Sequence, residues 1–415
     1  NSVLQTGKYQ SMKLPHEKFC VLPWISLEAS PIGTVRPCCL AEEEIEDDQG
    51  RKFHLGSATF GQIQQSQHMR ELRSEFLAGQ QPETCRKCWD EEHSGRRSKR
   101  MHTLDRLKHM LPDQTWTQDA KPLMFLDLKL GNICNLKCRI CGSWSSSTFA
   151  TEEVRFVHPG QDPKHTYHYK MLRDGSWPRS NNQFWEEVAG ISSQIRYLEF
   201  TGGEPFMIQE HFDFLQRLAD QGLAHQIEIH YNTNGTIWPT DAIDIWQQFA
   251  LVEVAFSIDD LGARYEYQRS NASWTQVQST IHKFQDLKSR MPNLRLQCCS
   301  TVNVFNVMYL EPLAQWLDQR QFDSVYWNIL HNPSELSIAN LSSSAKSFIC
   351  ARLQSAQVND FNRTEFNRII TFIQQGQPGD AKKLLDKIKE LDHRRQTDLR
   401  DHHLELASAI GYEGP

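Results

Sequence analysis

The chain has 415 residues, of which 39% are hydrophobic and 23% charged, and its mean hydropathy is -0.58. This composition is typical of a globular protein with two domains, or with one large α/β domain and an appendage. The formal net charge of -6 argues against a basic nucleic-acid binder. No apolar stretch reaches the roughly 18 residues of a membrane span. Asn1 to Lys13 contain no apolar segment, so we expect no secretory signal and a cytoplasmic protein.

Cysteines are the informative residue type. The chain has an odd number of them, and they are Cys20, Cys38, Cys39, Cys85, Cys88, Cys134, Cys138, Cys141, Cys298, Cys299 and Cys350. Without a secretory signal, a reducing compartment and metal ligation explain them better than disulfides.

Residues 1–118 are expected to form a small cysteine-rich domain. Within it, apolar residues near helical spacing predict a helix between Gly56 and Gly79, with Gly79 as its stop. The acidic run Glu42 to Asp48 and the basic run Arg96 to Arg100 are interpreted as solvated surface segments.

Residues 119–335 alternate short apolar strands with helical segments, which indicates a parallel sheet. Six strands are predicted, at Leu123–Leu130, Arg196–Thr201, Gln226–Asn232, Val252–Ile258, Leu294–Val302 and Ser324–Leu330. The helices between them are predicted at Gln183–Ile191, His211–Gln221, Pro239–Phe249, Thr275–Met291 and Tyr309–Arg320. Six such units predict a partial (β/α)6 barrel that is open on one side, in the α/β class.

Two further segments flank these units. The polar stretch Gly160–Asn182 is too long for an ordinary connection and is interpreted as a lid or a disordered insertion. Residues 336–415 are predicted to be a helical C-terminal extension. Its stretch Ala381–Leu399 is expected to be an exposed charged helix with an apolar stripe at Leu384, Leu385, Ile388 and Leu391.

A CxxxCxxC loop, Cys134, Cys138 and Cys141, directly follows the first predicted strand. Three thiolates within eight residues can hold three corners of a [4Fe–4S] cluster and leave one iron open to an external ligand. The spacing alone also allows a zinc knuckle that a distant residue completes.

The following motifs resemble those of the radical S-adenosylmethionine (SAM) superfamily over about residues 122–332. The second strand ends in Thr201-Gly202-Gly203-Glu204-Pro205, similar to the family motif for the SAM amino group, although GGEP alone also suits a strand-to-helix turn. The third strand runs into Asn232 to Gly235, similar to the family TNG turn. The resemblance further implies that Ser257, Arg269 and Asn303 contact the SAM carboxylate or ribose. The alternatives for these three are a turn residue, a surface ion pair and a strand-end cap.

The resemblance implies a mechanism. A reduced cluster cleaves SAM to methionine and a 5′-deoxyadenosyl radical, which removes a hydrogen atom from a substrate in the barrel. It also implies an electron donor of the flavodoxin or ferredoxin type.

Cys20, then Gly33-x4-Cys38, resembles the opening of a SPASM or twitch domain, the auxiliary-cluster module of many radical SAM enzymes. Cys85 and Cys88 would complete four thiolates for one auxiliary [4Fe–4S] cluster, which would accept an electron from the substrate. Cys38 is preferred over Cys39 because it fits the glycine spacing. In relatives this module is expected after the barrel, whereas here it precedes it. Structural zinc in the same thiolates stays open.

Three functions agree with these motifs. The preferred one is a radical SAM enzyme that modifies a peptide or protein side chain, because auxiliary-cluster families favour such substrates. The second is the same chemistry on a small molecule, such as the dehydrogenation of a sugar or nucleotide. The third is a non-catalytic iron–sulfur or zinc protein. A nucleic-acid partner is not expected, since the basic run is short.

Overall fold

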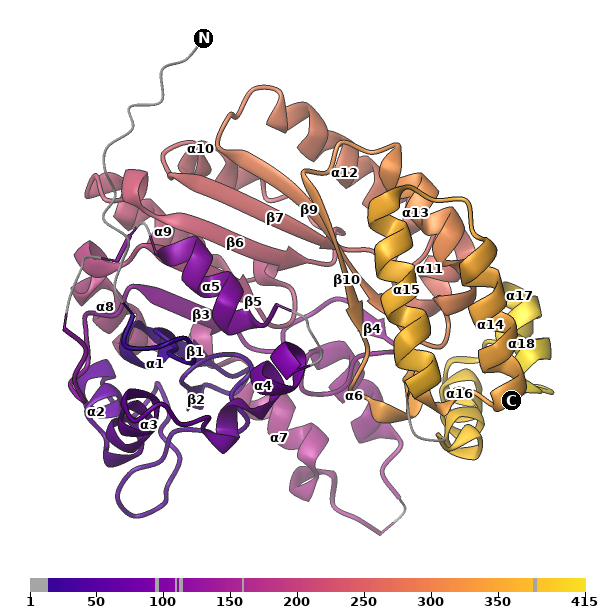
Figure 1. The fold of residues 1–415 in the computed structure, drawn as a ribbon, viewed down its shortest axis with the longest axis horizontal. Coiled ribbons are helices and arrows are strands. Elements are labelled where there is room, and N and C mark those ends of the chain that lie inside the picture. Colours follow the sequence, from indigo (N-terminus) through magenta and orange to yellow (C-terminus); the bar gives the residue numbers. More distant parts are fainter. Residues whose placement is uncertain (1–13, 94–96, 109, 112–114, 159, 376–378) are drawn as a thin grey trace.

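The fold is built on one eight-stranded sheet, with the strand order β10-β9-β7-β6-β5-β3-β1-β2 (Figure 1). The computed structural model describes residues 14–93, 97–108, 110–111, 115–158, 160–375 and 379–415, so the expectation about Asn1 to Lys13 lies outside the described residues. From β3 to β10 every neighbouring pair of strands in this sheet is parallel. The predicted partial barrel is therefore confirmed.

All six predicted barrel strands are present. They are β3 (Phe125–Lys129), β5 (Tyr197–Thr201), β6 (Glu228–Thr233), β7 (Leu251–Ser257), β9 (Leu294–Val302) and β10 (Ser324–Ile329). Two strands from the N-terminal region extend this sheet: β1 (Ser26–Ala29) runs parallel to β3, and β2 (Val35–Arg36) is antiparallel to β1. The N-terminal region thus continues the barrel sheet. The boundaries at residues 118 and 335 stay predictions.

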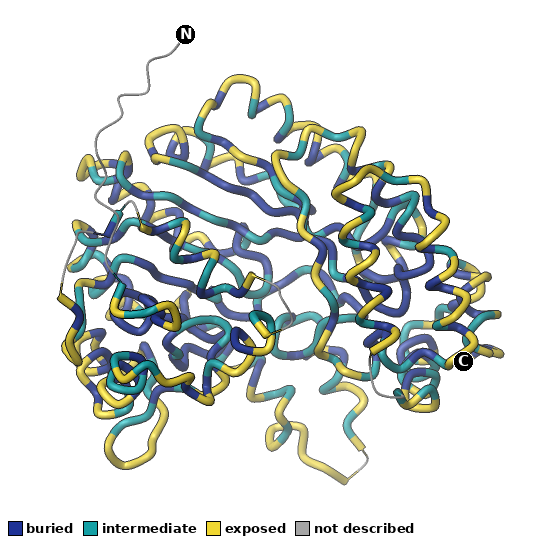
Figure 2. Tube along the Cα trace, viewed as in Figure 1, coloured by how far each residue is buried: buried dark blue, intermediate teal, exposed yellow. Residues whose placement is uncertain are grey.

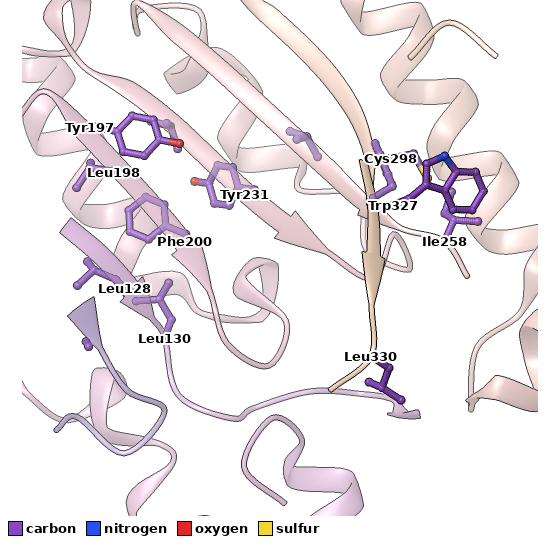
Figure 3. Packing of buried hydrophobic residues seen from close by; sticks show 14 of the residues in the cluster. Leu128, Leu130, Tyr197, Leu198, Phe200, Tyr231, Ile258, Cys298, Trp327 and Leu330 are labelled. Atoms are coloured by element: carbon purple, nitrogen blue, oxygen red, sulfur yellow. The ribbon is translucent and has the colours of Figure 1, made fainter. Parts of the chain in front are cut away.

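Helices cover the outer face of the sheet. They are α8 (Asn182–Gly190), α9 (Gln209–Asp220), α10 (Ile243–Trp246), α12 (Trp274–Lys288) and α13 (Leu310–Asp318). The helix predicted at Pro239–Phe249 is shorter than expected, since a 3-10 turn at Thr240–Ala242 precedes α10. The core on this face is rich in aromatic rings, and the stacked rings of Phe200 and Tyr231 have centroids 5.3 Å apart (Figure 3).

The inner face carries a row of ionisable side chains. Register pairs Glu28 with Asp127, Asp127 with Glu199, Glu199 with His230, and His230 with Glu253 across five strands. Residues paired in this way point to the same side of a sheet, so the row crosses the lumen. Asp127 is buried beside Glu199, and burial together with that carboxylate raises the pKa of Asp127 to about 7.

Helix α5 (Lys99–Leu107) lies across this inner face (Figure 1). Lys99 Nζ is 3.0 Å from Glu199 Oε2, and Arg106 lies 3.1 Å from Glu228 and 3.2 Å from Glu253. The prediction that the basic run is a solvated surface is therefore wrong for Lys99 and Arg100, which are largely buried because Glu199 pairs with Lys99 and Glu92 pairs with Arg100. Arg96 lies outside the described residues.

The other helices of the N-terminal region, the barrel loops and the insertion are short. The predicted helix between Gly56 and Gly79 is divided into α2 (Phe60–Gln64) and α3 (Gln67–Leu77), because Ser66 caps a new helix. Short helices also form at α1 (Leu22–Ile25), α4 (Arg86–His93), α6 (Ser147–Arg155) and α11 (Gly262–Gln268). The insertion Gly160–Asn182 contains α7 (Tyr167–Asp174), which contacts α6.

The C-terminal extension is helical, as predicted. It comprises α14 (Ser343–Ser355), α15 (Asp360–Gln375), α16 (Ala381–Arg395), α17 (Leu399–His402) and α18 (Leu404–Ile410). The predicted apolar stripe of α16 is buried at Leu384, Ile388 and Leu391 (Figure 2). The expectation of an exposed charged helix is wrong in the last turn, where Asp392 is also fully buried. Among the described residues, no helix combines the length and the hydropathy that crossing a bilayer requires.

Candidate functional site

Three thiols gather on the loop that follows β3. Cys134, Cys138 and Cys141 pack together with Leu136 and Ala272. A hydrogen bond from Cys141, with the positive charge of Arg269 nearby, lowers the pKa of the Cys138 thiol. A two-stranded ribbon, β4 (Lys137–Cys138) and β8 (Arg269–Ser270), holds the loop by antiparallel pairing.

The glycines of the GGEP turn press against this loop. Gly202 has φ +115°, and a Cβ there would lie 2.6 Å from the carbonyl oxygen of Gly131. A Cβ on Gly203 would lie 2.2 Å from the carbonyl oxygen of Ile133. The Gly203 and Glu204 N–H groups donate to Gly131 and Ile133 at 3.0 and 2.8 Å. No larger residue fits this approach, and the turn thereby fixes the start of the cysteine loop.

Glu204 connects the second motif to the third. It is 1% exposed, and burial raises the pKa of its carboxyl to about 7. The carboxylate accepts hydrogen bonds from Thr233 Oγ1 at 2.8 Å and from the Asn234 N–H at 2.7 Å. Asn234 Nδ2 in turn lies 3.8 Å from Cys134 Sγ. The sequence had singled out the NTNG turn, but not the contact of Asn234 with the cysteine loop.

Arg269 lies beside the cysteine loop in a buried ion pair. Its Nε and Nη2 are 3.0 and 2.7 Å from Asp259 Oδ2, and its Nη1 is 3.7 Å from Cys138 Sγ. Asp259 is 1% exposed and also accepts the Thr301 N–H at 2.8 Å. The alternative of a surface ion pair is therefore wrong: the pair exists, but it is buried, and it places a cation next to the thiols.

Ser257 and Asn303 end two neighbouring strands. Ser257 is the last residue of β7 and is half-buried. Asn303 follows β9 and is fully buried, with Nδ2 donating to Thr301 O at 2.9 Å and Oδ1 accepting from the Phe305 N–H at 2.9 Å. These bonds are those of a strand-end cap, so a contact of Asn303 with the ribose stays a prediction.

The residues around the first site fit an anionic cluster. Donors surround the thiols: the Leu136 N–H lies 3.4 Å from Cys134 Sγ, and Arg269 lies near Cys138. Such N–H groups stabilise negatively charged sulfur. Within the described part of the chain, no three His, Cys, Asp or Glu side chains are grouped as they would be around one metal ion.

Four further thiols line a second, small cavity beside the barrel. Cys20 precedes α1, Cys38 follows β2, Cys85 directly precedes α4, and Cys88 lies in the first turn of α4. Burial and the nearby Cys38 thiol raise the pKa of Cys88 to about 11. Lys99 and Arg100 line the same cavity and supply positive charge, so this donor set also fits an anionic cluster.

The structure separates Cys38 from Cys39. Cys38 is among the residues that line the cavity with the other three thiols, and Cys39 is not. This arrangement favours Cys38 as the ligand. Of the remaining cysteines, Cys298 faces the outer core and Cys299 the lumen, as the alternation in β9 predicted.

Lys99 is a functional candidate that the sequence reasoning missed. It lines the thiol cavity and also pairs with Glu199 on the inner face of β5, so one side chain connects the second site with the lumen. The available signal was Ser98, a helix cap, followed by basic residues seven apart at Lys99 and Arg106, which share one helix face.

The partial barrel carries one set of three cysteines after its first strand and a second set of four cysteines beside its edge. These features define the class: a barrel protein with two candidate iron–sulfur sites. Comparison with protein families agrees with this class. The model of the radical SAM superfamily matches residues 128–312, and the model of an iron–sulfur cluster-binding domain, SPASM, matches residues 20–89. Residues 128–312 are thus similar to the radical SAM superfamily, and the SPASM-like residues 20–89 precede the barrel. The cofactors of the chain are [4Fe–4S] clusters and SAM.

Several solved structures are similar to parts of the chain. The structure of anSMEcpe with bound AdoMet is 17% identical, with a TM-score of 0.35, and the match covers 66% of this chain and 62% of that one. The same protein with bound AdoMet and Cp18Cys peptide is 14% identical, with a TM-score of 0.34, covering 66% and 62%. Streptococcus suis SuiB bound to S-adenosylmethionine is 10% identical, with a TM-score of 0.35, covering 81% and 66%. This chain thus spans less than two thirds of the length of the first structure. None of the curated proteins matches the chain.

Proposed function

We propose that the chain cleaves SAM reductively and oxidises a peptide or protein side chain in the barrel lumen. The observation that carries this proposal is that both sets of cysteines adjoin the same barrel lumen. The cysteine loop directly follows β3, and Lys99, which lines the second thiol cavity, pairs with Glu199 on the inner face of β5.

The residues of the first site have separate roles in this proposal. Cys134, Cys138 and Cys141 would hold a [4Fe–4S] cluster with one iron left open to SAM. The Gly202–Gly203 backbone and Glu204 hold the amino group, while Ser257, Arg269 and Asn303 hold the carboxylate or ribose. When bound, these cofactors supply methionine and a 5′-deoxyadenosyl radical that takes a hydrogen atom from the substrate.

The second site serves electron transfer. Cys20, Cys38, Cys85 and Cys88 ligate all four irons of an auxiliary [4Fe–4S] cluster, so no iron is left for a substrate. The role left for this site is to accept the electron of the substrate radical. The cations Lys99 and Arg100 at this cavity favour an added negative charge.

A peptide substrate is supported by the open side of the barrel and by the SPASM domain. On the edge strand β10, Ser324, Tyr326 and Asn328 are exposed, and they share the face that β9 turns to the lumen. An exposed edge admits a chain that is longer than the lumen. We also propose a flavodoxin- or ferredoxin-type electron donor and a cytoplasmic location, in keeping with eleven free thiols.

The experiment is anaerobic reconstitution, followed by iron and sulfide counting and by a 5′-deoxyadenosine assay with dithionite. We expect about eight irons per chain. The substrate class is tested with two perdeuterated fractions of a cell extract, a protease digest and the small-molecule metabolites. Deuterium in 5′-deoxyadenosine from the digest alone supports a peptide; deuterium from the metabolites alone contradicts it.

The auxiliary role is tested by Cys85→Ala/Cys88→Ala, with Cys298→Ala/Cys350→Ala as the matched control outside both sites. The first pair should lose about four irons and stop oxidised product while SAM cleavage continues. Loss of a single zinc in place of these irons, or product formation in a folded variant, would contradict the electron-transfer role.

A further inference from the structure

Arg139 occupies the segment between two cysteines of the first site, Cys138 and Cys141, and its side chain is fully buried. Its Nε donates to Tyr267 O at 2.8 Å, and its backbone N–H donates to Gln268 O at 2.7 Å. The guanidinium also stacks on the Tyr267 ring, 3.6 Å from the centroid. A charge in this position is costly to bury and needs a counter-ion.

The counter-ion comes from the far end of the chain. Arg139 Nη2 lies 2.7 Å from Asp392 Oδ1, in the last turn of α16, and both side chains are 0% exposed. Asp392 is a hub for the C-terminal segment, since its two oxygens also accept from Tyr267, Thr397, Leu399 and Tyr412. So many donors hold the carboxylate in one geometry, and it therefore presents Arg139 with a fixed partner.

A second contact of α16 reaches the same loop by another route. Arg395 donates to Glu152 Oε1 at 3.0 and 2.9 Å and to Ser270 Oγ at 3.2 Å. Glu152 also pairs with Lys137, which directly precedes Cys138. The end of α16 thus contacts β8 directly, through Ser270, and is linked to β4 through Glu152 and Lys137.

We propose that the end of α16 is a clamp on the cysteine loop, in which Asp392 positions the segment Cys138–Cys141 through Arg139 so that all three thiols reach one cluster. The clamp rests on the proposed function, since it concerns the cluster of that site. A buried, hydrogen-bonded ion pair has few alternative arrangements, so it restrains the short segment between the two ligands more than apolar packing would. Asp392 and Arg139 are then positioning residues and take no part in the chemistry.

The test uses the reconstituted full-length chain with Asp392→Asn, which keeps the side-chain shape and removes the charge. Glu405→Gln is the matched control, because this carboxylate lies in the same extension but in an exposed pair with Arg352. Three quantities are measured: the rate of iron release to a chelator, the change in the EPR signal of the reduced cluster on addition of SAM, and the SAM Kd. The EPR change reports the first site alone, since a fully ligated auxiliary cluster has no iron for SAM.

We expect Asp392→Asn to speed the release of about four irons and to weaken SAM binding roughly 10-fold, while Glu405→Gln behaves as the natural chain. Arg139→Gln/Asp392→Asn should be no worse than the poorer single variant, because both act through one contact. Additive losses in the double variant would overturn the clamp.

The outcomes separate the two proposals. A natural chain whose reduced cluster does not respond to SAM contradicts the proposed function itself. If the natural chain responds to SAM and the Asp392→Asn variant equals it in iron release and SAM Kd, the clamp is refuted. This holds even if the variant unfolds more easily. Should Asp392→Asn fail to fold, Arg139→Lys decides by the same readouts, since it keeps the charge and loses the forked geometry.

Discussion

Arg269 offers a quantitative test of the SAM site. Its guanidinium is already paired with Asp259, and Arg269 and Asp259 are 8% and 1% exposed. A charge-assisted bond to the SAM carboxylate in so dry a place should contribute about 2–3 kcal/mol, which is about a 30- to 150-fold change in Kd. If the same pair were exposed, the effect would be close to zero.

The choice of variant matters because Asp259 is buried as well. Arg269→Ala would leave that carboxylate without its cation and cost about 3–5 kcal/mol of folding stability. Arg269→Gln/Asp259→Asn removes both charges and keeps two hydrogen-bonding side chains. Arg264→Gln/Asp260→Asn is the matched control, since Asp260 follows Asp259 in the chain and pairs with Arg264 at 3.0 Å, but Arg264 is more exposed than Arg269.

The assay is equilibrium binding of SAM to anaerobically reconstituted protein, with iron counting and urea unfolding of each variant. We expect the neutral pair to lose SAM affinity by the factor above with its iron content kept, and the Arg264 control to bind normally. Unchanged SAM affinity in Arg269→Gln/Asp259→Asn would refute the reasoning and leave Arg269 with a structural role only.

Three further predictions concern other parts of the molecule. Gly203→Ala should lower the iron content and reduce the free energy of unfolding by about 1–3 kcal/mol, because its Cβ would lie 2.2 Å from Ile133 O. Gly142→Ala, whose Cβ would have no atom within 4 Å, should change neither the iron count nor urea unfolding. Cys38→Ser should lose about four irons and Cys39→Ser none; the reverse would exchange their roles. The pKa of Asp127 is about 7 in the folded chain and 3.8 in the unfolded chain, so the folded chain binds this proton more tightly. The free energy of unfolding therefore falls as pH rises from about 4 to 7. In urea unfolding, the natural chain should therefore lose at most about 4 kcal/mol relative to Asp127→Asn across that range, and a constant difference would contradict this.

The barrel could be predicted from the sequence because its signals are local. Each strand is a short run of apolar or alternating residues, as in Leu294–Val302, where the predicted and observed limits coincide. The cysteine loop and the GGEP turn are equally local, since each motif lies within a few consecutive residues. The division of the first helix at Ser66 was missed because a cap competes with an otherwise continuous apolar pattern.

The site was predictable only to the level of its motifs. The resemblance singled out Arg269 and Asn303, but could not show that Arg269 is held by Asp259 or that the Asn303 amide hydrogen-bonds to backbone groups. Cys38 and Cys39 are adjacent, so only the direction of each side chain separates them. That direction depends on how β2 joins the sheet through β1, which no local pattern specifies.

Both wrong predictions about charged segments have the same physical cause. A charged helix is expected to be solvated because an isolated charge is expensive to bury, and a sequence shows the charges without their partners. Here the partners lie far along the chain: Lys99 meets Glu199, 100 residues away, and Asp392 meets Arg139, 253 residues away. Each long-range pair lies beside one of the two sets of cysteines, where an anionic iron–sulfur cluster would itself require nearby cations. The charged residues of α5 and α16 are thus wrongly predicted to be exposed when each helix is considered alone. Their burial is expected once two iron–sulfur sites lie beside them.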